Sequence, residues 1–126
     1  MKSDYHDPLV LARSCAELLD EKKISNVAIF DVADSLAITS YFVIGTGLNL
    51  RHLQSVVDHI QRTLKDHGVR RRGLEGYQEG KWILVDLGDV IIHLFQAESR
   101  RFYDLELLWG DSLRREFVPR QRQTST

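Results

Sequence analysis

The ionisable side chains that could carry out chemistry gather in one stretch, residues 81–109. Asp86 and Asp89 lie three positions apart, and His93 follows four positions later. Paired carboxylates hold the divalent cations of phosphoryl-transfer and nucleotidyl-transfer enzymes. A histidine beside a carboxylate can instead act as a general base. These residue types therefore raise two enzymatic hypotheses, a metal site and a catalytic base.

Neither hypothesis finds a complete set of groups in the sequence. A two-metal site needs several converging carboxylates, and a third acid beside Asp86 and Asp89 is missing. A catalytic base at His93 needs a nucleophile beside it, but the apolar runs around His93 contain no Ser, Thr or Cys. Glu75 could supply a further acid, but the sequence does not place it next to His93. We favour structural roles, in which Asp89 forms a turn and Asp86 hydrogen-bonds His93. A metal-dependent nucleotidyltransferase or phosphodiesterase using Asp86 and Asp89 is kept as the alternative function.

The element that positions these side chains is a β-hairpin over residues 81–95. Gly88 and Asp89 separate two apolar runs, and glycine accepts the positive φ of a two-residue primed turn. Pairing outward from this turn places aliphatic side chains on one face, which we assign to the core: Leu87, Val90, Val85, Ile92, Ile83 and Leu94. The other face carries Asp86, Ile91, Leu84, His93, Trp82 and Phe95. That mixed face is expected to meet either a helix or loop of the same chain or an external partner.

The rest of the chain predicts further helices and strands around this hairpin. Helices are expected over residues 8–22, 50–67 and 99–109, with Asp7, Asn49 and Ser99 as N-caps, and strands over 26–32, 41–46 and 69–76. The run 41–46 is apolar on both faces, which favours a central strand, and the charged run 69–76 suits a sheet edge. The order α, β, β, α, β, β, β, α predicts a single α/β (α+β mixed) domain over residues 1–113, with a mixed sheet covered by helices. Residues 114–126 are expected to be a disordered basic tail.

Other chemically suggestive residues have simpler explanations. Gly45-Thr46-Gly47 ends a strand before a helix, but it lacks the phosphate-binding fingerprints. His52 and His59 are two helical turns apart without a third ligand, so we expect solvent-facing histidines and no metal. Cys15 occupies a core position of the first helix, which favours a buried inert thiol. We predict no cofactor.

Composition narrows the classes of partner. The 126 residues carry a net charge of −1, which argues against binding chiefly through nucleic-acid phosphates. Only residues 70–72 and 114–122 are locally basic, which leaves direct contact of these segments with RNA open. The apolar runs are too short to span a membrane and the first residues resemble neither a signal peptide nor a presequence, so a cytoplasmic location is expected.

Several of the remaining residues are of the types that dominate protein interfaces. Trp82, Phe95, Arg101 and Tyr103 can remove large areas from water and still satisfy a polar end. They point to contact rather than reaction, although Trp82 and Phe95 could equally be buried beneath the last helix. A homodimer formed through the mixed hairpin face is a further hypothesis.

Ordered motifs across residues 8–113 resemble the Iojap-like ribosomal silencing factors, the RsfS family. The residues that carry this resemblance are Tyr41-Phe42-Val43-Ile44, Thr46-Gly47, Arg51-His52, Glu75-Gly76, Gly80, Trp82, Asp86-Leu87-Gly88-Asp89-Val90, His93, Arg100-Arg101, Tyr103, Leu105-Glu106 and Leu108-Trp109. Two positions depart from the family pattern. Asn49 replaces a frequent serine N-cap, and Ser40 stands where many relatives have an acid.

The resemblance implies a fold similar to the nucleotidyltransferase core, without known catalysis. It also implies binding to a protein of the large ribosomal subunit, large-subunit protein fourteen, on the face that meets the small subunit. Such binding would block subunit joining and lower translation when nutrients are short. Carried onto this sequence, the contact residues are expected to be Trp82 and Tyr103, supported by Asp86, His93, Arg101 and Glu106.

Overall fold

The computed structural model describes residues 5–33, 39–99 and, for the backbone, 113–115. Its helices are α1 (Pro8–Glu21) and α2 (Leu50–Asp66). Its strands are β1 (Ser25–Asp31), β2 (Tyr41–Gly47), β3 (Gly73–Glu75), β4 (Trp82–Asp86), β5 (Val90–Gln96) and β6 (Leu113–Arg115). The first two predicted helices and the five predicted strands are confirmed, with β3 shorter than expected. The predicted helix over 99–109 lies outside the described residues beyond Ser99.

Both helices begin where their sequences place a capping side chain. The Asp7 carboxylate accepts hydrogen bonds from the backbone N–H groups of Leu9 (2.9 Å) and Val10 (3.4 Å). Asn49 accepts one from the N–H of His52 at 2.8 Å. These bonds satisfy donors that the first helical turn leaves without partners.

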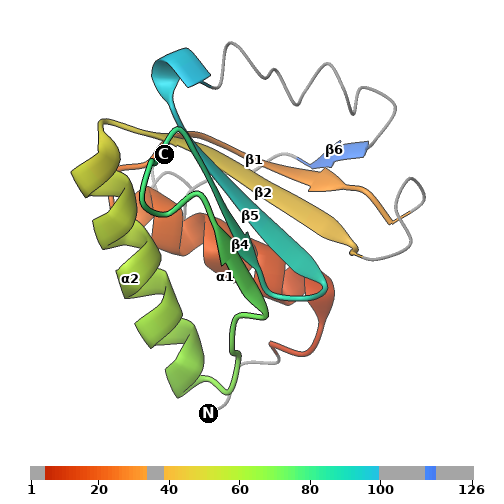
Figure 1. The fold of residues 1–126 in the computed structure, drawn as a ribbon. Helices are drawn as coiled ribbons and strands as arrows, with labels where there is room; N and C mark the ends of the chain where they lie inside the picture. Colours follow the sequence, from red (N-terminus) through yellow and green to blue (C-terminus); the bar gives the residue numbers. More distant parts are fainter. Residues whose placement is uncertain (1–4, 34–38, 100–112, 116–126) are drawn as a thin grey trace, which may run out of the picture.

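The strands form one mixed sheet in the order β3-β4-β5-β2-β1-β6 (Figure 1). β2 runs parallel to β5, and the other neighbours are antiparallel. The central position of β2 and the edge position of β3 are as predicted. β6, which pairs with β1 at the opposite edge, was not expected, and residues 114 and 115 of the predicted tail belong to it.

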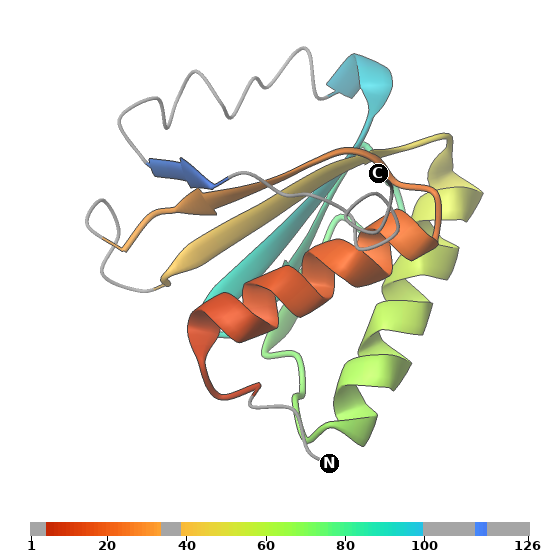
Figure 2. The same cartoon turned by 180° about the vertical axis from the view of Figure 1, so that it is seen from behind.

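Both helices cover the same face of the sheet (Figure 2). The core between them contains Leu19 of α1 and Ile60 of α2 together with the aliphatic face of the hairpin, all of whose members are buried as predicted. Cys15 is also fully buried here, and burial raises the pKa of its thiol to about 12. The prediction of a buried thiol is therefore confirmed. No helix in the described ranges is long and apolar enough to cross a membrane.

The hairpin has the predicted register, from Trp82 opposite Phe95 to Asp86 opposite Ile91. Gly88 has φ +94°, whereas Asp89 is not among the residues with positive φ. Positive φ at only the first central residue is the pattern of a type II′ turn, which matches the twist of the strands. The Asp89 carbonyl accepts hydrogen bonds from the N–H groups of Ser40 (2.9 Å) and Tyr41 (3.0 Å), so this turn also anchors the start of β2.

The glycines of the Gly45-Thr46-Gly47 segment have a packing explanation. A Cβ at Gly45 would lie 2.4 Å from the Ile24 side chain, and one at Gly47 would lie 2.4 Å from the Leu53 side chain. Both are closer than carbon atoms can approach. The two glycines therefore let α1, α2 and their flanking loops pack tightly against β2.

Candidate functional site

The mixed face of the hairpin is organised by contacts among Trp82, His93 and Phe95. The indole Nε1–H of Trp82 donates to Nδ1 of His93 at 3.0 Å. The indole also stacks on Phe95, with ring centroids 5.2 Å apart, and His93 meets Phe42 edge to face at 4.4 Å. Trp82 is half-buried, so these contacts hold a partly accessible indole in one orientation.

His93 is itself buried, with 4% of its surface exposed. Because Nδ1 accepts the indole hydrogen bond, the ring proton must sit on Nε2. Nε2 is buried, and none of the described residues is its hydrogen-bond partner. Burial lowers the pKa of His93 to about 4, so the ring is neutral at neutral pH. His93 therefore orients Trp82 from beneath and does not present its own ring at the surface.

The predicted hydrogen bond between Asp86 and His93 is wrong. Oδ1 of Asp86 accepts instead from the backbone N–H of Gly88 at 2.8 Å, and Nδ1 of His93 is occupied by Trp82. A carboxylate two residues before a turn reaches the turn's own N–H more easily than a diagonal neighbour on the next strand. Asp86 thus stabilises the turn, whereas the carbonyl group of Asp89 links the turn to the start of β2.

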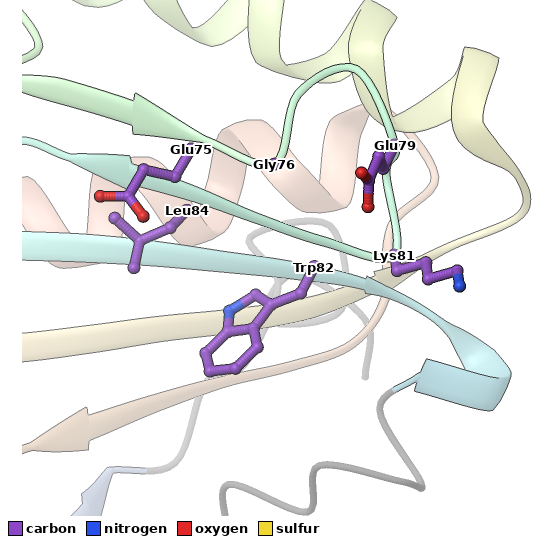
Figure 3. A pocket seen from close by; sticks show the side chains of 6 residues that line it. All are labelled: Glu75, Gly76, Glu79, Lys81, Trp82 and Leu84. Carbon is purple, nitrogen blue, oxygen red and sulfur yellow. The ribbon is translucent and has the colours of Figure 1, made fainter.

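A pocket of about 320 Å³ opens beside Trp82 (Figure 3). Its lining comes from β3, β4 and the loop between them: Glu75, Gly76, Glu79, Lys81, Trp82 and Leu84. The carboxylates of Glu75 and Glu79 lie on either side of Gly76, and the Lys81 side chain extends away from the indole. The sequence identified Trp82 but could not place the two glutamates, because the loop conformation decides where they lie.

The loop that walls this pocket is tied to its surroundings by side-chain hydrogen bonds. Gln54 of α2 donates to the Tyr77 carbonyl at 2.8 Å, and the Tyr77 hydroxyl donates to the Asp58 carboxylate at 3.0 Å. Gln96 at the end of β5 donates to the Gly80 carbonyl at 3.1 Å. The bond to Asp58 also raises the pKa of Tyr77. The pocket is therefore built before any ligand enters it.

The predicted site residues fall into three groups. Trp82 and Asp86 are half-buried at opposite ends of β4, and His93 is buried between them on β5. Three further predicted residues lie outside the described part of the chain: Arg101, Tyr103 and Glu106. The structure thus brings Trp82 and His93 together and separates both from the carboxylate of Asp86.

Leu48 is an exposed apolar residue that sequence reasoning missed. It is 79% exposed and directly follows β2, whose last residue Gly47 pairs with Gln96 beside the Trp82 end of the hairpin. Its position in the short connection between Gly47 and the N-cap Asn49 was the available signal. Leu48 therefore adds apolar surface at the same end of the sheet.

The two histidines of α2, His52 and His59, were predicted to face the solvent, but both are half-buried. His52 is half-buried: its Nδ1 accepts from the Leu48 N–H at 3.0 Å, and its Nε2 lies 2.7 Å from the Lys22 carbonyl, so it connects α2 to the end of α1. His59 is also half-buried, and desolvation lowers its pKa, with Lys22 and Arg62 adding to the effect. Across residues 5–33 and 39–99, no group of three or more His, Cys, Asp or Glu side chains could hold a metal ion.

A sequence model of the family described as "Ribosomal silencing factor during starvation", RsfS, matches residues 5–126. The chain belongs to the RsfS family. An RsfS from Haemophilus influenzae is 35% identical over 102 residues, covering 81% of this chain and all of the relative. One from Halalkalibacterium halodurans is 31% identical over 102 residues, covering 81% of this chain and 87% of the relative. The predicted family membership is thereby confirmed.

The RsfS fold is also confirmed by solved structures. A crystal structure from Chromobacterium violaceum has a TM-score of 0.75 at 28% identity and covers 92% of this chain and 93% of its own. The mouse protein "Mitochondrial assembly of ribosomal large subunit protein 1" is 34% identical over 95 residues, which cover 73% of this chain and 42% of the relative. RsfS membership fits a ribosome-associated regulator of translation and a non-enzymatic role.

Proposed function

We propose that this RsfS protein binds the large ribosomal subunit through large-subunit protein fourteen at the intersubunit face. Occupying that face sterically blocks joining of the small subunit and represses translation under nutrient limitation. The observation that carries the proposal is the fixed, partly accessible Trp82 indole beside a preformed pocket. An oriented aromatic side chain at the rim of a pocket is the arrangement that anchors protein interfaces.

The comparisons support a large-subunit partner. The family is named for ribosomal silencing, and the mouse relative is named for assembly of the large ribosomal subunit. A steric mechanism needs no catalytic group, which agrees with Asp86 and Asp89 serving the hairpin turn. The protein acts by covering a surface.

The proposal gives the site residues different roles. Trp82 contacts the partner, and Tyr103, Arg101 and Glu106 complete the contact. His93 is a positioning residue because it is buried and holds the indole, and Asp86 keeps the turn in shape. Leu48 extends the apolar part of the surface.

Co-sedimentation with purified large subunits tests this assignment. Trp82→Glu and Tyr103→Glu are each expected to abolish co-sedimentation while leaving the circular dichroism spectrum unchanged, since a charge at a desolvated interface centre is costly. Val10→Glu is the matched control, because Val10 is a partly exposed apolar residue on α1, one of the two helices on the opposite face of the sheet (Figure 2). If both interface variants bind as the wild type does, the assigned surface is wrong.

A subunit-joining assay tests the mechanism. Wild-type protein added to separated subunits should reduce the light-scattering signal of joined ribosomes, and Trp82→Glu should not. Binding to large subunits without any effect on joining would refute steric exclusion. Magnesium-dependent turnover of a nucleotide that Asp86→Asn abolishes would favour the enzymatic alternative instead.

A further inference from the structure

We infer that the pocket beside Trp82 receives an arginine side chain of the protein partner. This inference rests on the proposed function, since it names the chemical group that the docking surface recognises. The pocket is lined by Glu75, Glu79 and Trp82, and the three side chains come from β3, β4 and the loop between them (Figure 3). Its volume of about 320 Å³ is at the small end of ligand sites, as expected for a pocket that takes one side chain.

Charge is the first argument for a cationic occupant. Glu75 and Glu79 are exposed, and within the described residues neither carboxylate has a hydrogen-bond or ion-pair partner. Lys81 lines the pocket but extends its ammonium group away from the Trp82 indole. The pocket therefore has negative charge available for a ligand, and it disfavours the phosphates of RNA.

The shape and composition of the wall favour arginine over lysine. A guanidinium is planar and packs against aromatic rings, while its N–H groups reach two carboxylate oxygens at once. Trp82 and Leu84 provide the apolar surface, and Glu75 and Glu79 each provide a carboxylate acceptor (Figure 3). An ammonium group would also be attracted to the indole, but it lacks the planar fork that stacks on the ring and binds a carboxylate through two N–H groups.

The pocket is also rigid enough to select its ligand. Gly76 has φ +77°, and a Cβ there would lie only 2.0 Å from the Trp82 carbonyl oxygen, so the loop packs directly against β4. Gln54, Asp58 and Gln96 hold the same loop by hydrogen bonds. Little ordering is left for the moment of binding, which favours affinity and specificity.

Removing the two charges tests the inference on the ribosome. The double variant Glu75→Gln and Glu79→Gln keeps the side-chain shapes, and we expect it to bind large subunits about tenfold more weakly than the wild type, the loss expected when charge-assisted hydrogen bonds become neutral. Glu21→Gln, an exposed glutamate at the end of α1, is the matched control and should bind normally. Wild-type affinity in the double variant, together with loss of binding in Trp82→Glu, would overturn the inference while leaving the proposed function standing.

A ribosome-free titration separates the two proposals. The indole N–H resonance of Trp82, assigned by its absence in Trp82→Phe, should shift on addition of N-acetyl-arginine amide. N-acetyl-lysine amide should shift it less, and the neutral isostere N-acetyl-citrulline amide should leave it unchanged. The shift should vanish in the Glu75→Gln and Glu79→Gln double variant. A saturating arginine shift without large-subunit binding would refute the proposed function only, whereas equal shifts with citrulline and arginine would refute the arginine pocket.

Discussion

At the scale of the residue, His93 connects the interior of the protein to its surface. It gives the Trp82 indole a fixed acceptor, and its own buried Nε2–H has no hydrogen-bond partner within residues 5–33 and 39–99. An unsatisfied buried donor costs free energy, which a purely structural position would avoid by using an apolar side chain. We interpret this cost as the consequence of orienting a docking side chain.

The buried His93 predicts a loss of stability in acid. Its pKa is about 4 in the folded protein and about 6.5 when unfolded, so between these values only the unfolded chain binds the proton. The free energy of unfolding should therefore fall as the pH drops from about 6.5 to 4, by roughly 3 kcal/mol from this group. Urea unfolding at pH 7 and pH 4 measures this loss of unfolding free energy. The loss between the two pH values should be smaller in His93→Phe than in the wild type by the same amount. Equal acid sensitivity in the two proteins would contradict the prediction.

Cys15 provides a second prediction at this scale. Its side chain is fully buried and its pKa is raised to about 12, so the reactive thiolate is scarce in the folded protein at neutral or mildly alkaline pH. Iodoacetamide at pH 8 should leave the native protein unlabelled and modify it fully in urea, as judged by mass spectrometry. Rapid labelling of the native protein would show that α1 opens readily.

At the scale of the element, the loop between β3 and β4 depends on Gly76. In Gly76→Ala the added Cβ would be strained by the positive φ and would approach the Trp82 backbone oxygen closely. We therefore expect this change to lower the free energy of unfolding by roughly 3 kcal/mol. Gly68→Ala is the control, because Gly68 has a similar φ of +82° but no atom within 4 Å of the added Cβ. It should cost only about 1 kcal/mol. Equal costs in urea unfolding would mean that the loop does not pack as the structure shows.

The elements were predictable from the sequence where local signals agree. Asp7 and Asn49 mark the helix starts because capping is a contact within one turn, and Gly88 fixes the hairpin register because a two-residue turn leaves one pairing. Alternation along β4 and β5 then identifies the core face. β6 escaped prediction because three residues carry too little periodicity to identify a strand.

At the scale of the whole molecule, the candidate site was predictable only in part. Trp82 stands out by its residue type. The sequence could not show that His93 bonds to Trp82 and not to Asp86, because this choice depends on which groups come within hydrogen-bond distance in three dimensions. The pocket needs α2 and β5 to hold the loop, and those contacts join residues distant in the sequence. Tertiary packing therefore decides which side chains of the hairpin are available to a partner.

The charge of the whole protein predicts how salt affects ribosome binding. A protein that neutralises many RNA phosphates loses about 10³-fold or more in affinity between about 50 and 200 mM salt, because counterions are no longer released as favourably. This chain has a net charge of −1, and carboxylates line its pocket, so we expect it to dock on a ribosomal protein. Its affinity for large subunits should then fall by less than about tenfold over the same range of salt concentration. Quantitative co-sedimentation with large subunits at the two salt concentrations measures this difference. If affinity falls as steeply as it does for a phosphate-binding protein, the dominant contact is with ribosomal RNA. That result would contradict recognition through Trp82 and the pocket beside it.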